Sequence, residues 1–168
     1  MLRCRASEVT AVDKLKVGDK APDFDLVGDD GARVTRDAFK GRFLVLYFYP
    51  KDDTPGCTVE AKDFSAALAQ FRALGAEVVG VSRDSTKRHK SFCEKHALTI
   101  RLLSDEDAAT HRAWGAWGEK TMYGRTTEGC IRSTFLIDPE GRVRAVWSPV
   151  KVPGHATAVL DALRTAKG

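Results

Sequence analysis

The amino-acid sequence predicts an α/β fold in which a mixed central sheet is flanked by helices. One reason is a continuous apolar run, FLVLYFY (residues 43–49), of the kind that forms a strand buried on both faces of a sheet. A second reason is that segments with helical and strand periodicity alternate along the chain. The third reason is size, because 168 residues with 43% hydrophobic content are enough to bury a core.

The first half of the chain predicts three strands and a helix. In APDFDLVGDDGARVT, two short strands surround a turn at Asp29–Gly31, and the apolar strand 43–49 follows. From Thr54 the pattern becomes helical, and Gly75 is a typical residue for the helix end. Four apolar residues of this helix share one face: Phe64, Leu68, Phe71 and Leu74.

The second half continues this alternation. EVVGVS (77–82) predicts a strand, a helix follows from Asp84 or Ser85 to His96, and TIRLLSD (99–105) predicts another strand. A helix near 107–114 leads into a glycine-rich connection. IRSTFLID and RVRAVWS then predict a hairpin that turns at PEG, and GHATAVLDALRTA predicts a C-terminal amphipathic helix.

The chain is expected to form a single domain over residues 15–168. It contains no internal repeat or low-complexity linker, and its six prolines are scattered. Residues 1–14, which include Cys4, are interpreted as a disordered leader in which the cysteine is idle. The N-terminus has no apolar segment of a secretory signal, and no apolar run approaches the roughly 20 residues of a membrane span.

The charge pattern argues against nucleic acid as a partner. The net charge of +4 is small, and lysine and arginine are spread over the whole chain. A nucleic-acid binder would usually concentrate its basic residues on one element. The densest basic stretch, TKRHK (86–90), is interpreted as an exposed helix face.

The cysteines and histidines lack the spacings of metal sites. The four cysteines are far apart and form no C-x-x-C pair, and a domain of this size needs no disulfides, so a reducing cytoplasmic location is expected. No zinc-binding spacing includes the histidines. Surface or core positions explain them better: His89, His96, His111 and His155.

The junction YPKDDTPGC between the apolar strand and the first long helix carries the main chemical signal. Thr54 is a good N-cap, and Pro55 suits the first helical position because its missing N–H would have no partner there. Cys57 is therefore expected in the first turn, where free N–H groups and the helix dipole stabilise a thiolate. The Thr54 hydroxyl can point at the sulfur, and Pro50 would shape the turn and shield it from water.

A cysteine without context is most often a small buried hydrophobe. The position of Cys57 directly after a buried strand, within T-P-G-C, favours a reactive thiolate instead. A disulfide oxidoreductase would need C-x-x-C, but Thr54 occupies the first cysteine position. The site can attack or be oxidised, but it cannot form an internal C-x-x-C disulfide.

With these residues in view, the chain resembles the peroxiredoxins, specifically their Q-type or bacterioferritin comigratory protein branch. The resemblance extends from about residue 17 to residue 163, and P-x-x-x-T-x-x-C followed by a later arginine is highly specific in that order. Five segments carry it: GDKAPDFDL, FYPKDDTPGCTVEA, KTMYGR, RSTFLID and GHATAVLDAL.

The resemblance implies a thioredoxin-like fold and reduction of hydrogen peroxide or organic hydroperoxides, without a metal or organic cofactor. Cys57 would be the peroxidatic thiolate, which attacks the peroxide oxygen and becomes a sulfenic acid. Thr54 and Arg132 would hold the peroxide, Pro50 would shield the thiolate, and Glu60 would belong to the supporting polar network. A permanently charged guanidinium beside a thiolate also favours its ionised form.

The sequence departs from many members of this branch, which carry a resolving cysteine five residues after the first. Lys62 stands there in this chain. The alternatives are a one-cysteine enzyme that uses an external thiol, or resolution by another cysteine. Cys93 is the first candidate, because some relatives appear to use a cysteine in that helix, and Cys130 is the second. A Cys57–Cys93 disulfide would require the first turn after Cys57 to unwind.

The resemblance also implies partners. The expected reductant is thioredoxin or a similar small dithiol protein, and the expected oligomeric state is a monomer or weak homodimer. The alternative from another class is a peroxide sensor, in which oxidised Cys57 changes the helix so that it engages a partner protein. The absence of an added interaction domain counts against this alternative.

Overall fold

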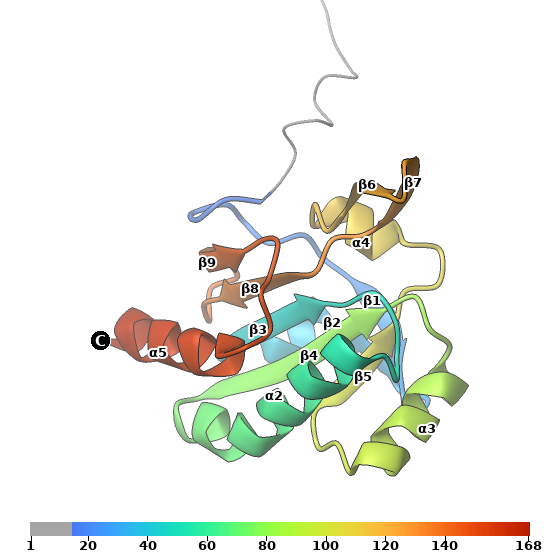
Figure 1. Ribbon diagram of the computed structural model, residues 1–168. Helices are drawn as coiled ribbons and strands as arrows, with labels where there is room; N and C mark the ends of the chain where they lie inside the picture. Colours follow the sequence, from blue (N-terminus) through green and yellow to red (C-terminus); the bar gives the residue numbers. More distant parts are fainter. Residues whose placement is uncertain (1–14) are drawn as a thin grey trace, which may run out of the picture.

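The computed structural model describes residues 15–168, so the predicted leader and Cys4 lie outside the described residues. Seven strands form a mixed sheet in the order β2-β1-β5-β4-β3-β8-β9 (Figure 1). The strands of this sheet are β1 (Asp25–Gly28), β2 (Arg33–Thr35), β3 (Phe43–Phe48), β4 (Ala76–Ser82), β5 (Arg101–Ser104), β8 (Ser133–Ile137) and β9 (Val143–Trp147).

Parallel pairing at the centre of the sheet places the carboxyl ends of three strands, β3, β4 and β5, on the same side of the molecule. Strand β3 pairs in parallel with β4, and β4 pairs in parallel with β5. The outer strands are antiparallel: β8 to β3, β9 to β8, β1 to β5 and β2 to β1. The helices are η1 (Arg36–Phe39), α2 (Pro55–Ala73), α3 (Thr86–His96), α4 (Ala109–Ala113) and α5 (His155–Lys167).

Alternate residues of β3 divide the core into two apolar clusters, one on each face of the sheet. Val45, Tyr47 and the following Tyr49 pack in the first cluster, which includes residues of α2, α3 and α5. Leu44, Leu46 and Phe48 pack in the second cluster, which includes Trp114 and residues near the N-terminus. Figure 1 shows α2 and α5 side by side over one face.

The order of elements confirms the predicted mixed α/β architecture. Both hairpins, the buried strand and the three longest helices occur where the sequence predicts them, and Gly75 ends α2 with a positive φ of 81°. The glycine-rich connection after α4 differs from the prediction. It forms a separate two-stranded sheet of β6 (Trp117–Met122) and β7 (Arg125–Cys130).

This additional hairpin turns at Tyr123 and Gly124, both of which have positive φ, as two-residue hairpin turns require. Its strands lie mostly exposed, and Tyr123 is 96% exposed at the tip. The two strands also lack the apolar alternation by which strands are usually recognised. In the sequence, the Tyr123–Gly124 pair was the one indication of a hairpin turn here.

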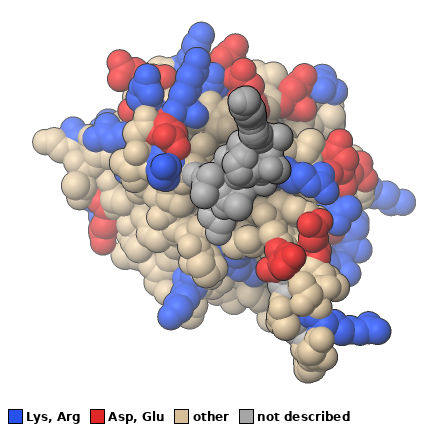
Figure 2. All heavy atoms as spheres, turned by 90° about the horizontal axis from the view of Figure 1, so that it is seen from above, with Lys and Arg blue, Asp and Glu red and all other residues tan. Residues whose placement is uncertain are grey.

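The surface bears charges of both signs. In the face shown in Figure 2, lysine and arginine side chains alternate with aspartate and glutamate around the rim. The basic stretch 86–90 was predicted to be an exposed helix face. Its lysines and arginine are exposed, but His89 is fully buried, so the prediction is only partly correct. Within the described part of the chain, no helix is long and apolar enough to cross a membrane.

Candidate active site

Cys57 lies at the carboxyl-terminal edge of the sheet, in the first turn of α2. Thr54 is the N-cap, Pro55 is the first helical residue, and the Thr58 N–H donates to the Thr54 carbonyl at 2.8 Å. Cys57 is 1% exposed and packs in the first apolar cluster. The buried strand β3 therefore delivers the chain to a helix N-terminus that holds the thiol, as predicted.

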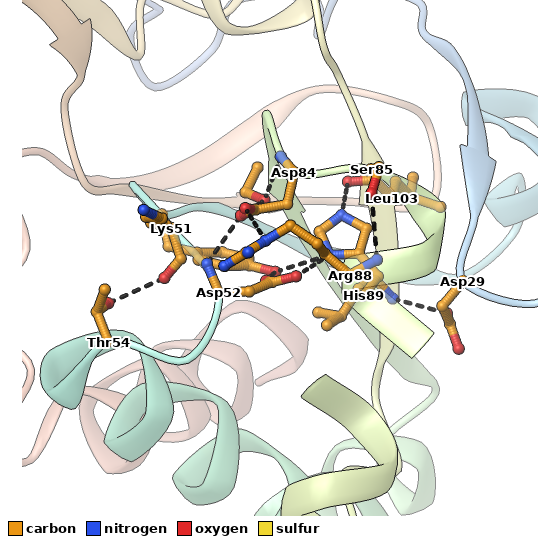
Figure 3. A network of polar contacts seen from close by, with 12 residues as sticks. Asp29, Lys51, Asp52, Thr54, Asp84, Ser85, Arg88, His89 and Leu103 are labelled. Carbon is orange, nitrogen blue, oxygen red and sulfur yellow. Dashed lines mark hydrogen bonds and ion pairs between the residues drawn. The ribbon is translucent and has the colours of Figure 1, made fainter. Parts of the chain in front are cut away.

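Thr54 occupies the predicted N-cap position, but its side chain makes no capping hydrogen bond. Its hydroxyl donates instead to the Lys51 carbonyl at 2.9 Å and closes the turn before the helix (Figure 3). This donation leaves the lone pairs of the hydroxyl oxygen available as acceptors. Pro50, four residues earlier, is exposed.

Arg132 lies between β7 and β8 and reaches the sulfur directly. Its Nη2 donates to Cys57 Sγ at 3.2 Å, and its Nη1 donates to Glu60 Oε1 at 2.5 Å. A permanently charged donor at this distance favours the thiolate over the thiol. Sequence reasoning missed Gly56, over which the guanidinium passes. A Cβ at this position would lie 3.3 Å from Arg132 Nη2, tighter than ordinary van der Waals contact.

Glu60 is a buried carboxyl one turn beyond Cys57. Burial raises its pKa to about 7, and the charge and hydrogen bond of Arg132 oppose that rise. Its Oε2 is buried without a hydrogen-bond partner. Arg132 therefore joins the sulfur to a carboxyl group that changes its ionisation near neutral pH.

His155, at the first position of α5, extends the polar surroundings of Arg132. Its Nε2 lies 2.8 Å from Thr134 Oγ1, and burial together with the charge of Arg132 lowers its pKa to about 4. The ring is therefore neutral at physiological pH, so the cationic charge beside the thiol stays on Arg132. Among the described residues, no group of three or more His, Cys, Asp or Glu side chains could hold a metal ion.

Cys93 and Cys130 lie on opposite faces of the sheet. Cys93, in α3, is half-buried and packs against the apolar cluster that contains Cys57. Cys130, at the end of β7, belongs to the other cluster. Burial raises the pKa of the Cys93 thiol to about 12, and the carboxylates of Asp29, Asp52 and Glu94 add to that rise. Lys62 is exposed on α2.

Sequence reasoning also missed a buried polar network beside the site, which Figure 3 shows. Asp52, in the junction YPKDDTPGC, and His89 are both buried, and Asp52 Oδ2 lies 2.7 Å from His89 Nδ1. The signal that remained unused was periodicity, since His89 precedes the buried Phe92 by three residues on the same helix face.

Comparison with known proteins identifies close relatives. A family model described as the AhpC/TSA family matches residues 17–146. Peroxiredoxin Bcp of Xanthomonas campestris is 52% identical over 134 residues, which are 80% of this chain and 84% of that protein. Peroxiredoxin Bcp of Bacillus subtilis is 46% identical over 153 residues, which are 91% of this chain and 96% of that protein.

Solved structures share the fold as well as the sequence. The Xanthomonas campestris bacterioferritin comigratory protein, studied for its alkyl peroxide reduction, is 46% identical with a TM-score of 0.85, covering 92% of this chain and 98% of that one. Two cysteine-to-serine variants of Xanthomonas campestris peroxiredoxin Q are each 47% identical, with TM-scores of 0.84 and 0.85. They cover 90% and 92% of this chain, and 97% and 98% of their own.

The fold and these relatives define a thiol-dependent peroxidase of thioredoxin-like fold, an oxidoreductase that takes a peroxide substrate and a thiol reductant. The chain belongs to the AhpC/TSA family, in the branch of the peroxiredoxins named Bcp or Q. The resemblance stated from the sequence is thereby confirmed.

Proposed function

We propose that Cys57 is the peroxidatic cysteine and that the enzyme reduces hydrogen peroxide and organic hydroperoxides. The observation that carries this proposal is the 3.2 Å contact from Arg132 Nη2 to Cys57 Sγ at the N-terminus of α2. Two sources of positive potential, a guanidinium and a helix dipole, converge on one buried sulfur. The alkyl peroxide reduction studied in the Xanthomonas campestris relative supports organic hydroperoxides as substrates.

In the proposed step, the Cys57 thiolate attacks one oxygen of the peroxide. An S–O bond forms, the O–O bond breaks, and the departing oxygen takes a proton to leave as water or alcohol. Sulfur is oxidised to a sulfenic acid as the peroxide is reduced. Arg132 stabilises the thiolate and the negative charge that develops on the departing oxygen.

Thr54, Pro50 and Glu60 have supporting roles in this proposal. The Thr54 hydroxyl, now bound to the Lys51 carbonyl, can rotate to hold the peroxide beside the sulfur. Pro50 shields the thiolate from water once substrate is bound. Glu60 orients Arg132 through the hydrogen bond to Nη1.

We propose Cys93 as the resolving cysteine. The Cys93 thiol attacks the sulfenic sulfur of Cys57, an S–S bond forms, the S–O bond breaks, and hydroxide leaves with the Cys93 proton as water. Cys93 packs on the same apolar cluster as Cys57, whereas Cys130 packs on the other cluster. The two cysteines substituted in the Xanthomonas campestris variants stand as far apart in that sequence as Cys57 and Cys93 do here.

This pairing requires Cys57 to leave its pocket, so the first turn of α2 unwinds on oxidation. The resulting disulfide is a substrate for thiol–disulfide exchange, which supports thioredoxin or a similar dithiol protein as the reductant. We further propose a cytoplasmic location, a single domain over residues 15–168 and a monomeric or weakly dimeric state.

The first test is peroxide consumption by Cys57→Ser with thioredoxin and its reductase. Loss of turnover is expected, and retained turnover would remove Cys57 from the mechanism. Sustained turnover by wild type also decides against a peroxide sensor as the main role.

The second test is brief peroxide treatment followed by non-reducing peptide mapping. Wild type and the control Cys130→Ser are expected to form a Cys57–Cys93 disulfide, and Cys93→Ser is expected to stop at sulfenic or sulfinic acid. Only sulfenic or sulfinic acid in wild type would favour a one-cysteine cycle with an external thiol.

A further inference from the structure

The loop that precedes the Cys57 helix is tied to α3, the helix that carries Cys93, at both ends of that helix. Two neighbouring loop residues make these contacts, Asp52 to the first part of α3 and Asp53 to its last turn. We call this pair of contacts the Asp52–Asp53 clamp. Cys93 lies between the two attachment points, one turn after His89.

The inner half of the clamp is buried. Asp52 Oδ2 lies 2.7 Å from His89 Nδ1, and its Oδ1 accepts from the Tyr49 hydroxyl at 2.5 Å. The Asp52 N–H donates to Asp84 Oδ2 at 2.8 Å, immediately before α3. Figure 3 shows Asp52 with Asp84 and His89 around it. Both carboxyl oxygens and the N–H of Asp52 are thus directed at the end of β3, at α3 or at Asp84 just before α3.

The partners of His89 define its hydrogen bonds in this arrangement. Its Nε2 lies 2.9 Å from the Leu103 carbonyl, which can only accept, so this nitrogen donates. Nδ1 then faces Asp52 Oδ2 at 2.7 Å, and a contact this short requires a hydrogen between the two atoms. One proton therefore lies between His89 Nδ1 and Asp52 Oδ2, in a short hydrogen bond enclosed by the protein.

The outer half of the clamp is at the surface. Asp53 accepts from Lys95 Nζ at 2.7 Å and lies 2.9 Å from His96 Nε2. Asp53 has a φ of 61°, in the left-handed region that aspartate tolerates better than most residues. This backbone conformation turns the Asp53 carboxylate to the same helix that the preceding Asp52 reaches.

Between the two halves the loop and helix do not pack closely. A hollow of about 250 Å³ is lined by Asp52, Asp53 and five residues of α3. The direct contacts between loop and helix on this side are therefore mainly the polar ones of Asp52 and Asp53. Such a connection can open without unfolding the sheet.

We propose that Asp52 and Asp53 are positioning residues for the resolving step, which hold α3 in place so that Cys93 reaches oxidised Cys57 only when the clamp opens. The inference rests on the proposed function of these two cysteines. While the clamp is closed, a second peroxide molecule can oxidise the sulfenic acid of Cys57 to sulfinic acid and leave as water or alcohol. The strength of the clamp thus sets the partition between disulfide and sulfinic acid.

The outer half is tested with a matched pair of variants on one helix. Lys95→Ala removes a clamp contact, whereas Lys90→Ala removes an exposed lysine for which the described residues give no ion pair. Reduced full-length protein is mixed with one equivalent of hydrogen peroxide without reductant, and the Cys57–Cys93 disulfide is followed by rapid quenching and mass spectrometry. We expect about two- to fivefold faster disulfide formation in Lys95→Ala only, the range for an exposed ion pair.

The inner half is tested with Asp52→Asn, which keeps the side-chain shape and removes the charge opposite His89. We expect disulfide formation about tenfold faster or more, because the amide replaces one carboxyl oxygen with a donor, so the buried contacts to Tyr49 and His89 cannot both be kept. The rate of sulfenic acid formation in a Cys93→Ser background should stay unchanged, and a merely destabilised fold would not produce that combination. Less sulfinic acid should accumulate at high peroxide.

The outcomes separate the clamp from the proposed function. Disulfide formation at the wild-type rate, or more slowly, in both Lys95→Ala and Asp52→Asn overturns the clamp and leaves the resolving role of Cys93 intact. If disulfide formation is faster in one variant alone, the contact removed in that variant restrains α3, and the proposed role of the other contact is rejected. No Cys57–Cys93 disulfide in wild type overturns the resolving role itself.

Discussion

Cys57 and Cys93 lie on the same face of the sheet, yet the charges around them have opposite sign. Cys57 lies at a helix N-terminus and accepts a hydrogen bond from Arg132. Cys93 lies in the middle of α3, where burial and three nearby carboxylates raise the pKa of its thiol to about 12. The contrast fits the two proposed steps, in which Cys57 reacts with peroxide and Cys93 then resolves the sulfenic acid.

The lesson is that one face of a sheet can hold two thiols in opposite electrostatic surroundings. In the proposed cycle, the sulfur beside Arg132 meets the peroxide. The sulfur of Cys93 becomes a nucleophile in that proposal after it leaves its anionic, half-buried position.

The largest expected effect comes from removing the cation beside Cys57. Arg132→Met should lower the second-order rate constant for peroxide by about 10²–10³-fold, the range for loss of one donor that stabilises developing negative charge. Stopped-flow measurement of Cys57 oxidation in a Cys93→Ser background reports this step alone. A change below tenfold would show that the helix N-terminus is sufficient.

The next effect concerns pH and Glu60. This carboxyl ionises near pH 4.5 when unfolded and near 7 when folded, so between these values the folded state binds more protons. The free energy of unfolding should therefore fall as pH rises through this window, by about 3 kcal/mol in total from this residue. The contribution is fully lost above pH 7.

Urea denaturation of the reduced protein between pH 4.5 and 8 measures this fall. Glu60→Gln keeps an acceptor for Arg132 and should remove about that much of the decrease, leaving the pH dependence of the other groups. Parallel stability curves for the two proteins would contradict the buried, high-pKa state of Glu60.

A smaller effect is expected on the Cys93 side of the comparison. A pKa of about 12 in place of 9.0 lowers the thiolate fraction about a thousandfold, and the greater nucleophilicity of the thiolate recovers part of this loss. In a Cys57→Ser, Cys130→Ser background, iodoacetamide should modify Cys93 about fortyfold more slowly in folded protein than in urea. Equal rates would mean that Cys93 is already accessible and ionisable.

The smallest effect sharpens the electrostatic part of this contrast. Asp29→Asn removes one of the carboxylates that raise the Cys93 pKa and keeps the oxygen that accepts from the Leu102 N–H. Alkylation of Cys93 should become about two- to fivefold faster, the size of a partly exposed charge interaction. An unchanged rate would assign the low reactivity to burial alone.

Most of the fold could be predicted because its elements bury one or both faces. Strand β3 is apolar throughout, and α2 repeats its apolar residues with helical spacing. The hairpin β6–β7 could not be found in this way, because its strands show no apolar alternation. They pair with each other in a separate two-stranded sheet. Only the Tyr123–Gly124 turn identifies it.

The site was predictable where one short segment contains both structure and chemistry. The strand end, Pro55 and Cys57 are such a segment, and the helix N-terminus follows from them directly. The contact between Asp52 and His89 joins residues of two elements, and each residue alone looks like an ordinary charged or helical position. The need for Gly56 appears only when Arg132 is seen to cross it.

The separation of Cys57 and Cys130 by the central sheet has a consequence for disulfide fidelity. The two sulfurs pack in apolar clusters on opposite faces, with the buried strand β3 between those clusters. Fraying at the start of α2 alone leaves the two sulfurs in different clusters, so a crosslink also requires Cys130 to leave its own cluster. A Cys57–Cys130 crosslink in an oxidised sample would therefore record a molecule in which the packing had opened on both faces of the sheet.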